Sequence, residues 1–350
     1  MGMPYIYYMV YSYLMILEMK HFFVIIGVLF LLGCNSPSDK EKYQNSRNNV
    51  VNVHDKIHEI DLDGILLGSL SIPIATNEYL IIGDCKSVDS IVHIFDINTF
   101  KHIRSLAYYG QGPLEIAMFA NVWFNEWNRN LYVNDGGQFK LLIFNIDSAI
   151  VSDSYTPILK SLDPIKCPSY NYFINDSISY GMFLSFEDSE AMSFLHMVGI
   201  WNMNNDSITM LKYIHPDLDL KRLSLAVSKD DSLYAECELR HDLISIFNFN
   251  GDLLCNIYGE NWGKTHTLNF LNACFTKDYL IAGYDGSVYE EHNPITKCHV
   301  FTKQGDYLAT LDFGCEILRF CYDAKRNRLI LCLNHTFQYG YLDLDTLVLN

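Results

Sequence analysis

The pentapeptide Ile94-Phe95-Asp96-Ile97-Asn98 recurs along the chain as a short apolar and aromatic run that contains Asp or Asn. Five further copies follow it, the last two weaker: Ile143-Phe144-Asn145-Ile146-Asp147, Ile200-Trp201-Asn202-Met203-Asn204, Ile246-Phe247-Asn248-Phe249-Asn250, Val300-Phe301-Thr302-Lys303-Gln304 and Tyr341-Leu342-Asp343-Leu344-Asp345. Their starts are separated by 49, 57, 46, 54 and 41 residues. Six copies at this period indicate a repeat architecture.

A second run precedes each copy, and it opens on a polar turn residue followed by β-branched or aromatic residues, as strands in hairpins do. These runs lie at 78–82, 130–133, 176–180, 231–234, 278–281 and 327–331. A turn and another strand come after each pentapeptide, most clearly at Gly251-Asp252-Leu253-Leu254 and Gly305-Asp306-Tyr307-Leu308. Four strands in about 50 residues are typical of one propeller blade.

The repeats predict an all-β protein, a six-bladed β-propeller with four-stranded antiparallel blades over residues 53–350. The aromatic fraction of 14% agrees with strands, and no window sustains a helical period. A ring leaves no exposed strand edge only if its two ends meet. We therefore expect Lys56–Asp61 to add a strand near the last blade, against or beside Thr346–Leu349.

The composition excludes two classes of protein. The 350 residues include 25 Lys and Arg against 41 Asp and Glu, with a net charge of −16, and 49% are hydrophobic. A disordered chain has few hydrophobic residues, and a polybasic nucleic-acid binder has the opposite charge. We expect no nucleic-acid partner.

The N-terminus has the pattern of a signal peptide. Met19-Lys20-His21 gives a short positive start, Phe22–Leu32 is an apolar run too short to span a bilayer, and Gly33 precedes Cys34. We interpret residues 1–33 as a signal peptide with its true start at Met19. The alternative is a membrane span across residues 4–32.

Leu31-Leu32-Gly33-Cys34 resembles the lipobox of bacterial lipoproteins, although Leu32 is larger than the residue usual there. This resemblance implies lipidation of Cys34, against the alternative of a buried cysteine after an apolar run. Residues 34–52 are polar and predict a flexible tether. Within it, Ser38-Asp39-Lys40-Glu41 is similar to the surface-export signals of Bacteroidetes lipoproteins, or is an ordinary solvated linker.

The lipobox, the six blades and Tyr109-Gly110-Gln111-Gly112-Pro113-Leu114-Glu115 together resemble the TolB-like six-bladed β-propeller lipoproteins of Bacteroidetes. The comparison spans residues 53–350 and implies an outer-membrane lipoprotein, facing the periplasm or the medium, more than it implies a chemistry. The glycine-rich stretch lacks the Lys and Ser/Thr of a phosphate loop. We expect a turn between blades in which Gly110 and Gly112 take positive φ, Pro113 fixes the exit and Glu115 accepts backbone hydrogen bonds.

Nine cysteines follow Cys34, without a Cys-x-x-Cys pair or zinc-site spacing. Most lie in apolar runs, where a free cysteine behaves as a small buried hydrophobe. A single disulfide bridge, such as one between Cys315 and Cys321, is left as an alternative.

Propellers usually bind ligands on the face that carries the loops between second and third strands and between blades. The candidate binding residues on that face are Asp84, Lys86, Tyr109, Asp135, Gln138, Arg240, His241, Trp262, Asp285 and His335. Asp84, Asp135 and Asp285 would be metal ligands if Ca²⁺ bound in the channel, as in lactonase-like propellers. The alternative is that each Asp caps its own loop.

The leading functional hypothesis is a lipid-anchored binding module of the cell envelope that uses this face to bind a protein or a glycan. No catalytic residues are assigned, because neither a Gly-x-Ser-x-Gly elbow nor a nucleophile–base pair stands out, and an enzyme is the less favoured reading. We expect no cofactor and contact with the membrane only through the lipid. The rival hypothesis is a Ca²⁺-dependent, lactonase-like hydrolase.

Overall fold

A computed structural model describes residues 40–163, 167–188, 193–218, 220–264, 267–288, 291 and 293–348. Lys42–Asn350 form one compact unit, distinct from Met1–Glu41. The predicted signal peptide and Cys34 lie outside the described residues. In the part of the chain that the structure describes, no helix has the length and apolarity needed to cross a membrane.

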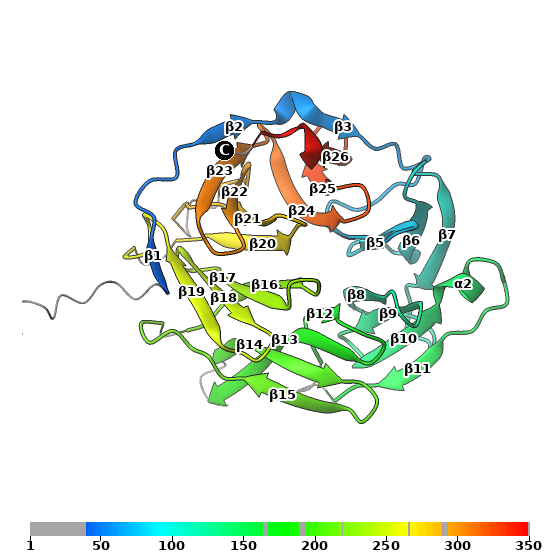
Figure 1. The fold of residues 1–350 in the computed structure, drawn as a ribbon. Coiled ribbons are helices and arrows are strands. Elements are labelled where there is room, and N and C mark those ends of the chain that lie inside the picture. Colours follow the sequence, from blue (N-terminus) through cyan, green and yellow to red (C-terminus); the bar gives the residue numbers. More distant parts are fainter. Residues whose placement is uncertain are drawn as a thin grey trace, which may run out of the picture. The chain divides into compact units, whose positions relative to one another are not determined.

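Six antiparallel sheets are arranged around a central axis as the blades of a propeller (Figure 1), which confirms the predicted fold class. Blade 1 contains β4 (Ser71–Ala75), β5 (Tyr79–Asp84), β6 (Ser90–Asp96) and β7 (His102–Tyr108); blade 2 contains β8 (Phe119–Asn125), β9 (Asn130–Asp135), β10 (Lys140–Asn145) and β11 (Ile158–Ser161); blade 3 contains β12 (Tyr170–Phe173), β13 (Ile178–Asp188), β14 (Ser193–Asn202) and β15 (Ser207–Leu211). Blade 4 contains β16 (Leu223–Ser228), β17 (Leu233–Glu238), β18 (Leu243–Asn248) and β19 (Leu253–Tyr258); blade 5 contains β20 (Phe270–Phe275), β21 (Tyr279–Tyr284), β22 (Lys297–Thr302) and β23 (Tyr307–Asp312); blade 6 contains β24 (Glu316–Asp323), β25 (Arg328–Asn334) and β26 (Tyr339–Asp343). The short helices α2 (Ile146–Ala149) and η3 (Leu344–Thr346) follow third strands.

The third residue of the pentapeptide, Asp or Asn in five copies and Thr302 in the fifth, forms the turn that follows the third strand of each blade. In blade 1, Asp96 Oδ1 accepts hydrogen bonds from the backbone N–H groups of Asn98 and Thr99 at 3.0 and 2.8 Å. Equivalent bonds are accepted by the side chains of Asn145, Asn202, Asn248, Thr302 and Asp343. The repeat in the sequence is therefore a repeat of local turn chemistry.

Alternate side chains of one strand pack against different neighbouring blades. In β5, Leu80 and Ile82 lie in a cluster with Ile330 of blade 6, whereas Ile81 lies in a cluster with Val133 of blade 2. Both faces of the strand are thus buried, which explains why the second strands read as continuous apolar runs.

The ring is closed by β3 (Ile57–Glu59), which is the outermost strand of blade 6. It pairs antiparallel with β26, with Ile57 opposite Leu342 and Glu59 opposite Gly340. The expected N-terminal closing strand is confirmed. Its partner differs from the expectation, because the chain after β26 turns into η3 and cannot continue the sheet.

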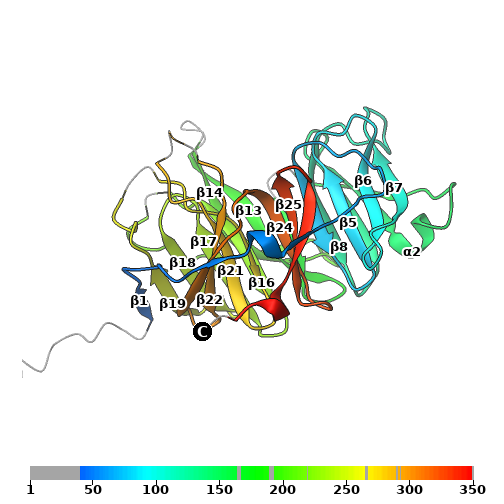
Figure 2. The same cartoon turned by 90° about the horizontal axis from the view of Figure 1, so that it is seen from above.

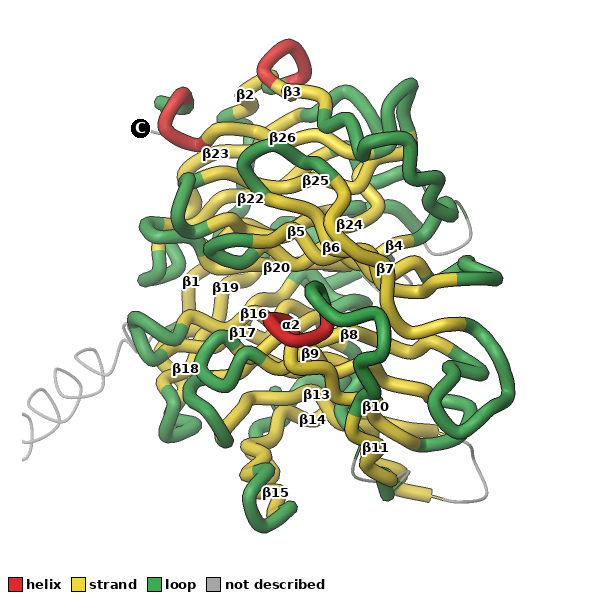
Figure 3. Tube along the Cα trace, turned by 90° about the vertical axis from the view of Figure 1, so that its right-hand side faces the viewer, coloured by secondary structure: helices red, strands yellow, loops and turns green. Residues whose placement is uncertain are grey.

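The structure departs from the expected tether at residues 42–52, which form part of the propeller. We call residues 42–59 the belt. Its strand β1 (Glu41–Tyr43) joins the sheet of β19, β2 (Val50–Asn52) pairs in parallel with β23, and the short helix η1 (His54–Lys56) leads into β3. Figures 2 and 3 show the belt on the outside of the ring, next to the outer strands of blades 4, 5 and 6.

A buried ion pair fixes the belt between blades 4 and 5. The Arg47 guanidinium lies 2.6 Å from Asp242, and the two side chains are only 4% and 0% exposed. Arg47 also lies over the ring of Phe301, at 5.2 Å from its centroid. Tyr43 stacks on Tyr258 further along the belt, with ring centroids 4.6 Å apart.

All nine described cysteines are free thiols, and five of them are buried, so the bridge left open between Cys315 and Cys321 is not formed. Burial raises the pKa of Cys321 to about 12, which keeps its thiol protonated and unreactive.

Replacing Arg47 by Ala is expected to destabilise the propeller by about 3–5 kcal/mol, because it leaves the Asp242 carboxylate buried and unpaired. Urea unfolding followed by circular dichroism measures the change. The matched control is Lys42→Ala, which removes a belt ion pair to Asp306 whose side chains are 26% and 61% exposed. That variant should lose less than about 1 kcal/mol. Equal losses for the two variants would contradict the role given to the buried pair.

Candidate functional site

The predicted binding residues lie at the ends of second strands, in the loops that follow them or between blades. The three aspartates among them accept hydrogen bonds from backbone groups of their own blade. The Asp84 carboxylate accepts hydrogen bonds from the backbone of Gly68 and Lys86, each at 2.8 Å. Asp135 is fully buried, and its carboxylate accepts hydrogen bonds from the backbone N–H groups of Ala117, Met118, Gly137 and Gln138. Through these hydrogen bonds, each carboxylate holds in place the segment that precedes the first strand of its blade.

The same position in blade 4 carries Glu238, which the sequence analysis did not single out. Its Oε1 accepts a hydrogen bond of 2.7 Å from the backbone of Arg222, just before β16. Burial raises the pKa of the Glu238 carboxyl to about 8. In blade 5, Asp285 Oδ1 accepts from the backbone of Ser287, and its Oδ2 is buried without a partner among the described residues.

These contacts favour the loop-capping alternative for Asp84 and Asp135. Each of the two is already saturated by backbone donors of its own blade. Over the described ranges, no three His, Cys, Asp or Glu side chains are grouped so that they could hold a metal ion.

The glycine-rich stretch is a turn between β7 and β8, as expected, but the glycines have a different role. Glu115 Oε2 accepts a hydrogen bond of 2.8 Å from the Gly112 N–H. Gly110 and Gly112 do not have positive φ. A Cβ on Gly110 would lie 2.0 Å from the Glu115 carboxylate, so a larger residue there would push the Glu115 side chain out of its place in the turn. The Lys140 ammonium then donates to the carbonyls of Gly112 and Pro113.

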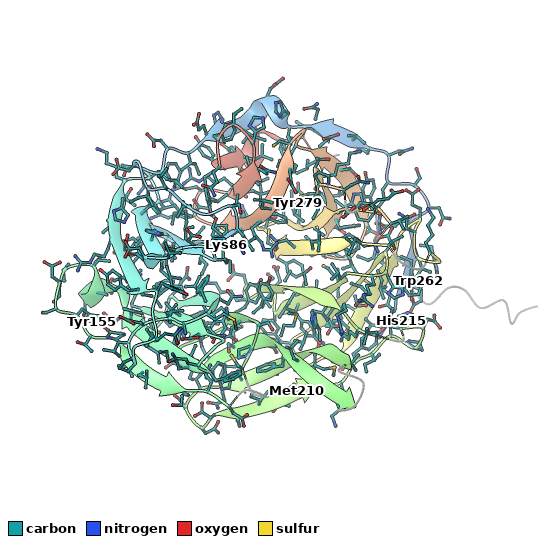
Figure 4. All side chains as sticks on the ribbon, turned by 180° about the vertical axis from the view of Figure 1, so that it is seen from behind. Lys86, Tyr155, Met210, His215, Trp262 and Tyr279 are labelled. Atoms are coloured by element: carbon teal, nitrogen blue, oxygen red, sulfur yellow. The ribbon has the colours of Figure 1, made fainter. Side chains whose placement is uncertain are left out.

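The remaining predicted residues form separate local groups. Trp262 contacts His241, with ring centroids 5.8 Å apart, and His215, at 5.1 Å. His335 lies edge-on to His54 of the belt, at 5.7 Å. Figure 4 shows Lys86 at the inner rim of the ring, far from Trp262 and His215 at its outer edge. The remaining three, Tyr109, Gln138 and Arg240, lie on the loops predicted for them. The ten residues therefore do not converge on one site.

A cavity lies in the central channel. Its volume is about 660 Å³, and its wall is built by the first strands of all six blades, β4, β8, β12, β16, β20 and β24. The cavity also includes the loops that connect first to second strands, at Asn77, Trp127, Lys229, Lys277 and Lys325. Those loops lie at the opposite end of the blades from the predicted face. None of the ten predicted residues lines the cavity.

The mouth of the cavity combines an exposed aromatic ring with paired and unpaired charges. The Trp127 side chain is 45% exposed, and the Lys229 ammonium lies 4.8 Å from its ring centroid. Lys229 also pairs with Glu126 at 2.9 Å, and Lys303 pairs with Asp231. Lys277 and Lys325 are exposed, and no partner of their ammonium groups is found among the described residues.

The sequence does contain a signal for the lysines at the mouth of the cavity. Lys229, Lys277 and Lys325 each stand one or two residues before the polar residue that opens the second strand of blades 4, 5 and 6. Sequence analysis used these segments only as turn markers, because a lysine in one polar turn is usually a solvated surface residue. Its recurrence at one place in three repeats was the available signal.

Comparison with solved structures supports the fold. A candidate exported protein of Bacteroides fragilis superposes with a TM-score of 0.54 at 11% identity, over 83% of this chain and 87% of that chain. A member of the DUF4221 family from Bacteroides vulgatus gives 0.53 at 10% identity, over 81% and 94%. The β-propeller domain of Cps50 (Swd1) from Myceliophthora thermophila gives 0.50 at 10% identity, over 82% and 99%.

At these identities the likeness shows the propeller fold alone. No protein-family model matches the sequence, and no curated protein matches it. The chain is therefore a six-bladed β-propeller with structural neighbours in Bacteroides.

Glu238→Gln is expected to remove part of the pH dependence of stability. The carboxyl has a reference pKa of 4.5 and a folded pKa of about 8, so between these values the folded state holds a proton that the unfolded state has lost. The free energy of unfolding therefore falls as the pH rises through this window. The variant keeps an oxygen for the Arg222 N–H and should be more stable than the parent at pH 9, by roughly 2–4 kcal/mol, and similar near pH 4.5. Denaturant titrations at both pH values test this, with the exposed Glu260→Gln as control. A parallel pH profile for parent and variant would contradict it.

Proposed function

We propose that this protein is a non-catalytic binding module of the cell envelope, which is anchored by a lipid on Cys34 and binds its ligand in the central cavity. The observation that carries the proposal is the cavity of about 660 Å³ enclosed by all six blades. Pockets for small ligands typically measure about 300–1,000 Å³. A cavity of this size accepts a few sugar residues or the end of a peptide, but not a folded domain. Of the predicted partners, it fits a glycan better than a protein.

The composition of the wall supports binding rather than catalysis. The cavity carboxylates of Glu126 and Asp231 are held in ion pairs with lysines, so their charges are already compensated. The exposed Trp127 ring at the mouth offers an aromatic surface against which a sugar can pack.

The proposal of a lipid anchor is based on the sequence. Leu31-Leu32-Gly33-Cys34 resembles a lipobox, and the chain as a whole resembles TolB-like lipoproteins. One Bacteroides neighbour is described as a candidate exported protein, which agrees with an envelope location. We propose an outer-membrane lipoprotein that faces the periplasm or the medium.

Cys34→Ala is expected to move the protein from the membrane fraction to the soluble fraction and to abolish incorporation of radiolabelled palmitate, because the thiol that receives the lipid is gone. Cell fractionation and labelling in a Bacteroides host measure both effects. Cys85→Ala, which removes a thiol inside the propeller, is the control and should stay membrane-bound. Retention of Cys34→Ala in the membrane would contradict the anchor and favour a spanning segment.

Two tryptophans distinguish the two faces of the propeller. Trp127→Ala is expected to weaken glycan binding about tenfold or more, because an exposed aromatic anchor contributes about 1–2 kcal/mol. Trp262→Ala, on the opposite face, should bind as the parent does. Immobilised envelope glycans and an affinity pull-down with mass spectrometry provide the assay. The reverse result would place the site on the face predicted from the sequence, and equal binding by both variants would remove the cavity from the proposal.

A further inference from the structure

The residues that line the cavity have a net positive charge, whereas the whole chain has a net negative charge. Its lining contains five cations, Lys229, Lys277, Lys303, Arg319 and Lys325. It contains three carboxylates, Glu126, Asp230 and Asp231, so the net charge of the lining is +2. The whole chain has a net charge of −16. A concave, low-dielectric wall concentrates the field of the charges that line it, so this excess attracts anions locally.

Two of the excess cations belong to the same kind of loop on adjacent blades. Lys229 and Lys303 are compensated by Glu126 and Asp231. Lys277 follows β20 of blade 5, and Lys325 follows β24 of blade 6, and neither ammonium has a partner within the described ranges.

A third cation lies further along the channel. Arg319 is part of the wall in β24, and the hydrogen bond found for its guanidinium goes to the neighbouring carbonyl of Leu318, at 2.8 Å. Its charge lowers the pKa of the Cys85 thiol against the larger effect of burial, which places Arg319 near the loop after β5. Most of its hydrogen-bonding capacity is therefore open to a ligand.

The mouth of the cavity also offers an aromatic surface that suits a sugar ring. The Trp127 ring is exposed there and can pack against the C–H face of a sugar, as aromatic faces pack against apolar surfaces.

We infer that the ligand of the central cavity is a carboxylated saccharide, with a carboxylate held between Lys277 and Lys325 and a sugar ring against Trp127. This inference rests on the proposed function and narrows it from any glycan to an anionic one. An acidic peptide would share the charge, but it would not need the exposed indole of Trp127. The volume of about 660 Å³ limits the enclosed part to a few sugar residues.

The test uses isothermal titration calorimetry of the whole propeller with three probes: trigalacturonate, the neutral galactotriose and tri-glutamate. We expect trigalacturonate to bind at least about tenfold more tightly than either other probe, because it alone offers both the charge and the sugar face. Its affinity should fall as salt is raised from 50 to 300 mM, since ion pairs at an open mouth are screened.

The variant Lys277→Gln/Lys325→Gln should lose about tenfold or more in affinity for trigalacturonate, and Arg319→Gln should add to that loss. The control is Lys101→Gln, an exposed lysine after β6 that does not line the cavity and should leave binding unchanged. Circular dichroism spectra check that each variant is folded.

The outcomes separate this inference from the proposed function. If galactotriose binds as tightly as trigalacturonate and only Trp127→Ala weakens it, the anionic ligand is excluded and the glycan-binding module stands. If tri-glutamate binds most tightly, the ligand is an acidic peptide and the saccharide is excluded. Binding of trigalacturonate that is indifferent to the two lysines would place it elsewhere and overturn the inference. If no probe binds, the inference also falls, and the proposed function then depends on the tryptophan pair alone.

Discussion

The pairing of β3 with β26 is the constraint on which the rest of the structure depends. Six blades in an open row would leave one face of the first and of the last blade unpacked, and they would not enclose a channel. Without β3, the outer edge of β26 would also stay unpaired. The backbone hydrogen bonds between Ile57–Glu59 and the last strand convert the row into a ring. The cavity exists because of this closure, since its wall needs the first strand of every blade. Fold and candidate site are therefore set by one short strand from the N-terminal side.

The belt extends this closure over two more blades. After each blade has its own four strands, β1 and β2 add a fifth strand to blades 4 and 5. The contacts combine main-chain hydrogen bonds with side-chain contacts, among them the stacking of Tyr43 on Tyr258 and the buried pair of Arg47 with Asp242. A buried pair of this kind is costly to desolvate, but removing either partner is costlier still. The pair of Arg47 with Asp242 therefore determines the position of the belt more than it increases the stability of the fold.

The fold could be predicted from the sequence because each blade repeats the same local chemistry. The Asp or Asn after the third strand is needed for the turn, as Asp96 and Asn248 show, so it recurs even where the apolar residues drift. The belt could not be predicted, because residues 42–52 are polar and pair through their backbone, which leaves no pattern in the side chains. The candidate site was harder still to predict from the sequence. Its cations belong to several blades and meet only in the ring, and the carboxylates chosen instead, Asp84 and Asp135, are conspicuous for a structural reason.

Closure from the N-terminal side also governs the order of folding. Ile57 pairs with Leu342, so β3 has to wait for nearly the whole propeller to be made before it finds its partner. Blades 1 to 5 can form their hairpins locally, but blade 6 stays three-stranded until β3 docks. Contacts this distant in sequence slow the final step, and the unpaired edge of β26 is exposed until then. The free edge of β26 is consequently the place where two partly folded copies can associate wrongly, because a β3 strand from a neighbouring copy could fill the same edge.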